Sequence, residues 1–283
     1  MLEADFLKHL NKLRIIMQKK VASSYIGERE SMYVGRGSMF RDHRIYVPGD
    51  DIRDIDWKVF ARTDRFHIKQ YEDDRSLTVH IILDYSASMN FGERIKKYEY
   101  AAMLGIAYAY IAWKNNERFV LSTFADSLDR FKAQQGKKQM AGILEYLREK
   151  KPGGKSKFKD SLVTYAKQIE TRSMVVVVSD FLYDLREIEE VLAWFKTNDV
   201  VLIQVLDEAE TEIRLKGEFQ LKDSETQSIM KTSIDEKARE KYLDQLADHK
   251  QRLDWIAGSI GARFFSFSTD IPIFDAVYNV LRK

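Results

Sequence analysis

The chain of 283 residues is long enough for one or two domains with a sizeable hydrophobic core. Its formal net charge of +2 gives no support for nucleic-acid binding, and the absence of cysteine excludes disulfides, thiol catalysis and cysteine-ligated metals. Charged residues fill the start of the chain, which argues against a secretory signal, and the longest uncharged run, residues 100–113, is shorter than the ~20 residues that span a bilayer. We therefore expect a soluble cytoplasmic protein without a transmembrane segment.

Residues 1–76 are expected to form an N-terminal module. Apolar residues at spacings of three and four predict an amphipathic helix over residues 2–18. Residues 35–74 then interleave arginine and aspartate with hydrophobic side chains. Because arginine and carboxylate groups form bidentate pairs, this stretch indicates an ion-pair network that holds an irregular segment; a polar binding surface is the alternative. We expect Trp57 to be buried and to anchor the module on the following domain.

Residues 77–283 alternate strands and helices, which is typical of a doubly wound, mostly parallel α/β sheet. Strands are expected at residues 77–83, 118–124, 127–131, 174–178, 200–206 and 262–267. Helices are expected at residues 94–114, 138–150, 159–170, 185–196, 234–258 and 273–281. Charges and a glycine turn interrupt this rhythm at about residues 207–234, where we predict an inserted β-hairpin.

Oxygen-bearing side chains follow both of the most apolar predicted strands. Asp84, Ser86 and Ser88 come after the first of these strands, and Asp180 comes after the second. Ser156 lies between them in a glycine-broken loop. Open α/β sheets bind ligands at the carboxyl ends of their strands, and carboxylate and hydroxyl oxygens suit Mg2+ or Mn2+. For the Asp-x-Ser-x-Ser turn taken alone, capping of the following helix is the alternative.

The order Asp-x-Ser-x-Ser, Gly-Gly-x-Ser and strand-Ser-Asp resembles the metal-ion-dependent adhesion site (MIDAS) of von Willebrand factor A domains. The resemblance implies that Ser86, Ser88 and Ser156 bind the cation directly, while Asp84 and Asp180 act largely through water. One position is then open to a carboxylate from a partner. Ser156 departs from the usual threonine, and because serine lacks the methyl group that restricts χ1, we expect a looser ligand there.

Residues 35–89 carry a second resemblance. Gly-x-Gly, Arg-x-Tyr-x-Pro-Gly-Asp-Asp-x-Arg-x-Ile-Asp-Trp and Ala-Arg precede Asp-x-Ser-x-Ser-Met. This pattern resembles the bacterial domain-of-unknown-function family fifty-eight, von Willebrand factor A-like proteins associated with MoxR-type AAA+ ATPases. Many relatives carry two N-terminal transmembrane helices, and this chain is similar to the short branch that lacks them. The resemblance implies a MoxR-type AAA+ ATPase or another acidic protein as partner, in chaperone-like assembly or activation of other proteins.

Two enzyme classes compete with this interpretation. A phosphate-binding loop would need glycine where Glu149 stands, five positions before Gly154. A magnesium-dependent phosphoester hydrolase would need a second carboxylate two residues after Asp84, where Ser86 stands. The five histidines are scattered, without a pair at metal or triad spacing. We therefore predict a non-enzymatic, metal-dependent interaction protein, with the hydrolase as the alternative.

Basic residues surround the loop that carries Ser156. We expect five of them to form a rim that attracts an acidic partner: Lys150, Lys151, Lys155, Lys157 and Lys159. The alternative is an ordinary solvated surface.

Overall fold

The computed structural model describes residues 34–35, 39–72, 78–115, 117–131, 137–212, 217–222, 229–234 and 236–282. These residues belong to two compact units, one within residues 16–76 and the other within residues 77–283. The helix expected at residues 2–18 lies outside the described residues.

The smaller unit contains a three-stranded antiparallel sheet in the order β1-β3-β2. Its elements are β1 (Val34–Gly35), β2 (Met39–Ile45), a 3-10 helix (Ile52–Asp54), α2 (Trp57–Thr63) and β3 (His67–Glu72). Asp56 caps α2 by accepting from the backbone amide of Lys58 at 2.9 Å. The guanidinium group of Arg44 donates two hydrogen bonds to the carboxylate of Asp50, at 2.7 and 2.8 Å. Charged side chains thus hold the loops of this unit.

The prediction that Trp57 is buried is wrong. Trp57 is 57% exposed, and its ring meets the rings of Phe60 and Phe66 edge-on at 6.1 and 6.4 Å. Apolar atoms make up more than half of an ordinary protein surface, so an aromatic residue among charged neighbours does not have to be buried.

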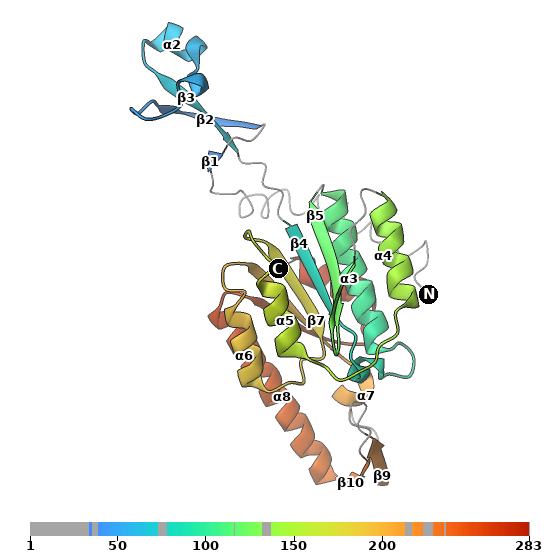
Figure 1. The fold of residues 1–283 in the computed structure, drawn as a ribbon. Coiled ribbons are helices and arrows are strands. Elements are labelled where there is room, and N and C mark those ends of the chain that lie inside the picture. Colours follow the sequence, from blue (N-terminus) through green and yellow to red (C-terminus); the bar gives the residue numbers. More distant parts are fainter. Residues whose placement is uncertain are drawn as a thin grey trace. The chain divides into compact units, whose positions relative to one another are not determined.

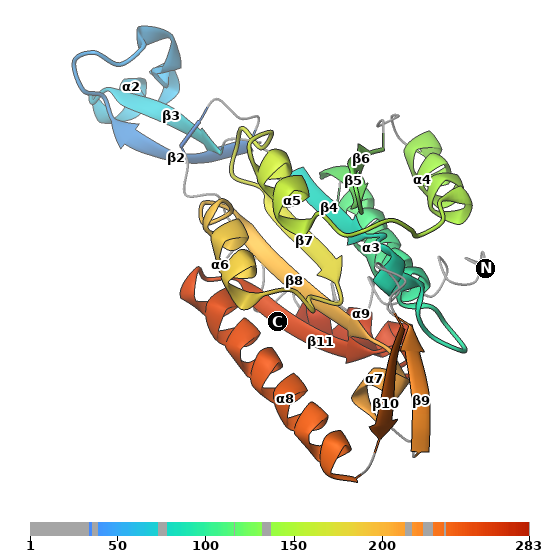
Figure 2. The same cartoon turned by 60° about the horizontal axis from the view of Figure 1, so that its bottom comes forward.

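The larger unit is built on a six-stranded sheet in the order β11-β8-β7-β4-β5-β6. Its strands β7, β4 and β5 are labelled in Figure 1, and β11, β8 and β6 are labelled in Figure 2. All neighbouring pairs are parallel except the pair of β5 and the edge strand β6. The strands are β4 (Thr78–Asp84), β5 (Arg118–Phe124), β6 (Leu128–Arg130), β7 (Met174–Ser179), β8 (Asp199–Leu206) and β11 (Arg263–Ser268). The prediction of a mixed α/β unit with a mostly parallel central sheet is confirmed.

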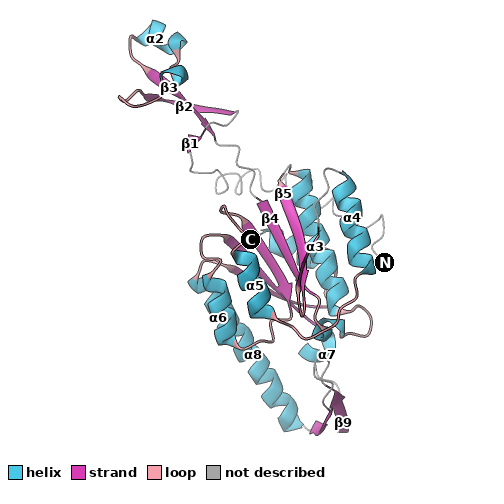
Figure 3. Ribbon diagram, viewed as in Figure 1, coloured by secondary structure: helices cyan, strands magenta, loops and turns pink. Residues whose placement is uncertain are grey.

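Helices cover both faces of this sheet (Figures 2 and 3). One face packs against α3 (Lys97–Lys114), α4 (Lys137–Glu149) and α9 (Ile273–Arg282). The other packs against α5 (Phe158–Ala166), α6 (Leu185–Ala193) and α8 (Glu236–Ser259). Val79, Ile81 and Leu83 of β4 pack on the α3 side, and Ile82 packs on the opposite side. Coverage on both faces explains why β4 is almost continuously apolar.

The expected element boundaries differ from the observed ones by a few residues. The helix expected at residues 159–170 ends at Ala166, where Lys167 and Gln168 form a turn. Between β8 and α8 the chain forms the short helix α7 (Glu208–Thr211) and an antiparallel pair, β9 (Gly217–Lys222) and β10 (Ile229–Ile234).

Candidate metal centre

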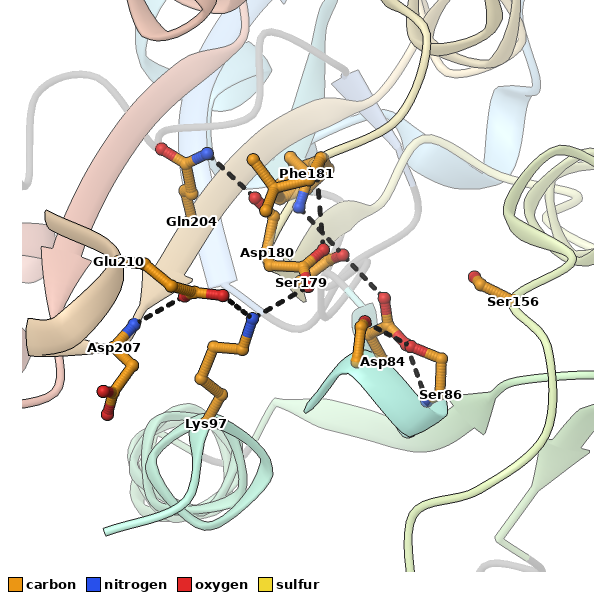
Figure 4. A network of polar contacts seen from close by, with 12 residues as sticks. Asp84, Ser86, Lys97, Ser156, Ser179, Asp180, Phe181, Gln204, Asp207 and Glu210 are labelled. Carbon is orange, nitrogen blue, oxygen red and sulfur yellow. Dashed lines mark hydrogen bonds and ion pairs between the residues drawn. The ribbon is translucent and has the colours of Figure 1, made fainter. Parts of the chain in front are cut away.

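The side chains of Asp84, Ser86 and Asp180 meet at the carboxyl edge of the sheet, as Figure 4 shows. Asp84 is the last residue of β4, and Asp180 follows the last residue of the neighbouring strand β7. All three side chains are buried, Asp84 and Ser86 with no exposed surface at all. The parallel register of β4 and β7 therefore places two carboxylates inside the protein, where a charge is costly without compensation.

The carboxylate of Asp84 accepts three hydrogen bonds from the protein. Its Oδ1 atom accepts from the backbone amide of Ser86 at 2.9 Å. Its Oδ2 atom accepts from the hydroxyl groups of Ser179 at 2.7 Å and Tyr183 at 2.5 Å. Burial and the neighbouring charge of Asp180 nevertheless raise the pKa of Asp84 to about 6, against the effect of these three donors. The three hydrogen bonds thus hold the Asp84 carboxylate in place, but they do not offset the cost of its burial beside the charge of Asp180.

Backbone hydrogen bonds bring the loop of Ser156 to the same edge. Three of them hold this loop: Gly153 N to Tyr85 O at 2.9 Å, Ala87 N to Gly154 O at 3.1 Å and Lys157 N to Ala125 O at 2.8 Å. Gly154 has φ +79°, a conformation that favours glycine. As a result, the Oγ atom of Ser156 lies 2.7 Å from the Tyr183 hydroxyl, which also contacts Asp84.

The hydroxyl groups of Ser86 and Ser88 have the spacing of neighbouring ligands around a small cation. Their Oγ atoms lie 3.0 Å apart and share a hydrogen bond. Two adjacent ligands of an octahedral Mg2+ at its usual bond length of about 2.1 Å are separated by about 3.0 Å. The pair therefore fits an octahedral ion, although in the described part of the chain no three His, Asp or Glu side chains converge as metal ligands.

The charges around Asp180 also suit a divalent cation. The Nζ atom of Lys97 lies 3.1 Å from Oδ2 of Asp180 and 2.8 Å from Oε1 of Glu210 (Figure 4). Lys97 is buried, and although burial lowers its pKa, the two carboxylates outweigh this and raise it. Lys97 carries one positive charge, whereas the carboxylates of Asp84, Asp180 and Glu210 carry three negative charges when ionised. These four side chains therefore have a formal charge of −2. A divalent cation would neutralise it.

Residue-by-residue reading of the sequence missed four members of this cluster: Lys97, Ser179, Tyr183 and Glu210. Ser179 had a signal, since it belongs to the strand-Ser-Asp pattern before Asp180. Lys97 follows another lysine at the start of α3 and looks like a surface residue in sequence, and nothing marks Tyr183 or Glu210.

Two of the five predicted rim lysines are engaged in ion pairs. Lys150 contacts Asp129 at 2.6 Å, and Lys159 pairs with Glu190. Lys151, Lys155 and Lys157 are exposed and make no ion pair with the residues that the structure describes. The free basic charge near Ser156 is therefore smaller than the sequence suggests.

Residues 42–252 match a family described as "Protein of unknown function DUF58". The chain belongs to this family. An uncharacterized protein of Mycobacterium tuberculosis is 26% identical to the DUF58 chain over 266 residues, which make up 92% of this chain and 84% of the relative. Neither match names a reaction.

Solved structures with similar chains share little sequence with this DUF58 protein. An aerotolerance-related membrane protein from Bacteroides fragilis is 14% identical, with a TM-score of 0.45, over 73% of this chain and 98% of that one. Proximal thread matrix protein 1 from the mussel byssus, with a zinc-occupied MIDAS motif, is 16% identical, with a TM-score of 0.38, over 72% of this chain and 45% of that one. With TM-scores this low, these structures do not establish the fold of this chain, which is described by its own strand order.

The cytoplasmic location predicted from the sequence is contradicted by these comparisons, because the Bacteroides fragilis structure is of a membrane protein. We assign no compartment in its place. Within the described ranges, no helix has both the length and the apolar character required to cross a membrane.

Proposed function

We propose that this DUF58 chain is a non-enzymatic, von Willebrand factor A-like protein that binds Mg2+ or Mn2+ at the carboxyl edge of its sheet and uses the ion to bind a protein partner. The observation that supports the proposal most strongly is the 3.0 Å separation of the Ser86 and Ser88 hydroxyl oxygens beside a buried cluster of negative charge. In this proposal residues 77–283, with an insertion at about residues 207–234, form the binding domain, and residues 1–76 form an accessory module.

Each site residue has a separate task in this proposal. Ser86, Ser88 and Ser156 supply hydroxyl oxygens to the cation, while Asp84 and Asp180 hold water molecules around it. Because Mg2+ prefers six oxygen ligands and keeps several waters, three hydroxyl groups leave room for an oxygen from outside the chain. A carboxylate of the partner suits that position, since the cation would otherwise be bound mainly by neutral groups.

The partner class that we propose is a MoxR-type AAA+ ATPase that presents an acidic residue. Lys151, Lys155 and Lys157 are the exposed lysines available to attract it, because Lys150 and Lys159 already pair with acidic residues of this chain. Attraction of this kind speeds association and weakens with salt over a Debye length of about 8–10 Å.

Calorimetric titration of Mg2+ and Mn2+ tests the metal site. We expect the wild type to bind, and Asp84→Ala and Ser86→Ala to lose most of the affinity. Ser122→Ala is the matched control, because Ser122 is as fully buried as Ser86 but lies within β5. Equal affinity in Ser86→Ala and Ser122→Ala would show that the hydroxyl pair is not a ligand pair.

Surface plasmon resonance with a MoxR-type ATPase tests the use of the metal. Chelation and Ser86→Ala should each abolish the complex, whereas replacing Lys151, Lys155 and Lys157 by glutamine should mainly slow association. A complex that keeps its affinity after chelation would place the binding surface elsewhere. Magnesium-dependent turnover of phosphoester substrates that is lost in Asp84→Asn would favour the hydrolase instead.

A further inference from the structure

We propose that His249 is a positioning residue that holds Asp180 in place beside a bound cation. This inference rests on the proposed function, in which Asp180 holds water molecules around the ion. His249 lies in α8, and its Nε2 atom is 2.7 Å from the carbonyl oxygen of Phe181, the residue that follows Asp180. A side chain 68 residues after Phe181 thus contacts the turn that carries the acidic group.

Phe181 has a backbone conformation that a bulky residue rarely adopts. Its φ is +49°, and within the described part of the larger unit it is the only residue other than glycine with a positive φ. This conformation is unfavourable because it brings the Cβ atom close to a carbonyl oxygen of the main chain. Such conformations persist only where the surrounding contacts enforce them, and they are concentrated at functional sites. The turn after β7 therefore requires contacts that fix the backbone of Phe181.

The conformation of Phe181 directs main-chain amides toward side chains of the same turn. The amide of Phe181 donates to Oγ of Ser179 at 3.1 Å, and the amide of Leu182 donates to Oδ1 of Asp180 at 3.4 Å. Rotation of Phe181 into the common right-handed or extended region would turn the Leu182 amide away from the Asp180 carboxylate. The position of this carboxylate therefore depends on the backbone of Phe181.

Two side chains from outside the turn hold its carbonyl groups. Gln204 of β8 donates from Nε2 to the carbonyl oxygen of Asp180 at 2.8 Å (Figure 4). His249 contacts the next carbonyl oxygen, that of Phe181. Because a carbonyl oxygen can only accept, the Nε2 atom of His249 donates in this hydrogen bond, whether or not the ring is charged. Residues of β8 and α8 thus fix two consecutive carbonyl groups, and the second belongs to the strained residue itself.

Calorimetric titration of Mn2+ into the full chain and its His249 variants tests this role. We expect His249→Leu, which removes the donor, to bind Mn2+ about tenfold more weakly, because outer hydrogen bonds that orient the groups of a metal site typically contribute about 10- to 100-fold to affinity. His249→Gln keeps an amide N–H at about the reach of Nε2 and should restore most of the affinity. If His249→Leu does not fold, His249→Asn replaces it, since the shorter amide matches the reach of Nδ1 instead.

Ile256→Ala is the matched structural control. Ile256 is buried in α8 seven residues after His249, two helical turns further along the same face. Its truncation loosens the packing of the helix but leaves the hydrogen bond to Phe181, so this variant should bind Mn2+ like the wild type. Weakening as large as that of His249→Leu would assign the effect to general loosening and overturn the inference.

A double-mutant cycle with Asp180 provides a second readout that a purely structural role would not move. In the Asp180→Asn background, His249→Leu should cost little further affinity, because the carboxylate that it positions is already gone. Equal losses in the two backgrounds, equal weakening by His249→Leu and His249→Gln, or wild-type affinity in His249→Leu overturns the inference while the metal site stands. If the wild type itself binds neither Mg2+ nor Mn2+, the proposed function and the inference fall together.

Discussion

The Nζ atom of Lys97 lies 3.1 Å from the Oδ2 atom of Asp180, although 83 residues separate them in the sequence. Lys97 also contacts Glu210 at 2.8 Å. It thereby connects the start of α3 with the turn after β7 and with α7, which follows β8. This buried lysine gives the Asp180 carboxylate a cationic partner inside the protein.

Replacing Lys97 by methionine should lower the free energy of unfolding by about 3–5 kcal/mol, because Asp180 is left buried without its cationic partner. Urea denaturation measures this loss. Lys150→Met is the control, since Lys150 and Asp129 form a partly exposed pair that contributes about 0–1 kcal/mol. Similar losses in the two variants would contradict a special role for the buried pair.

Lowering the pH should reduce the free energy of unfolding, because His80 takes up a proton more readily in the unfolded chain. Burial, aided by the charge of Arg130, lowers the pKa of His80 from 6.5 to about 4. Below pH 6.5 the unfolded chain takes up a proton that the folded chain does not, so this contribution to stability is lost as the pH falls from 6.5 toward 4. We expect His80→Gln to remove about 2 kcal/mol of the pH dependence between about pH 7 and 5, measured by urea denaturation. Parallel pH profiles in the two proteins would count against it.

Gly154→Ala should destabilise the loop that holds Ser156. An added Cβ atom would lie 3.3 Å from Cγ of Asp126, and φ of +79° strains any side-chain-bearing residue, for an expected cost of about 1–2 kcal/mol. Gly153→Ala is the neighbouring control, because its Cβ would meet nothing within 4 Å. Thermal unfolding of both variants measures the difference, and equal midpoints would show that the loop tolerates the change.

Saturating Mg2+ should raise the unfolding midpoint of the wild type. At about one hundred times the dissociation constant, binding to the folded state alone adds about 2.7 kcal/mol, or about 5–10 °C for a domain of this size. A chelator should reverse the shift. Ser86→Ala should show no shift and Ser122→Ala the full one, so a shift that persists in Ser86→Ala would assign the ion to another site.

The strands of the larger unit could be predicted because their sequences are constrained on both faces. Residues 174–179 are apolar except for the final serine, a pattern that fits a central parallel strand and little else. The positions of Asp84 and Asp180 follow from the ends of such strands. Trp57 could not be placed in this way, since its burial depends on which residues pack over it and not on its own chemistry.

The supporting contacts of the site could not be predicted from local sequence. Tyr183 and Asp84 are 99 residues apart, and Lys97 and Glu210 are 113 residues apart. Neither pair has a fixed spacing or a periodic pattern, because their meeting depends on how the turns after β4, β7 and β8 are arranged. A pattern of ligands can be read from consecutive residues, whereas the side chains that orient them come from anywhere in the fold.

The pairing of β4 with β7 also has a consequence for how the protein is made. Val79 pairs with Met174 and Leu83 with Val178. Strand β4 therefore cannot pair with β7 until β7 has been synthesised, about 95 residues later. Contacts between residues so distant in sequence form late and slowly. A chain emerging from the ribosome exposes Asp84 and both serines of its turn before Asp180 and Tyr183 exist. Under the proposed function, an unfinished chain could not engage its partner, and association would begin only once the central sheet is complete.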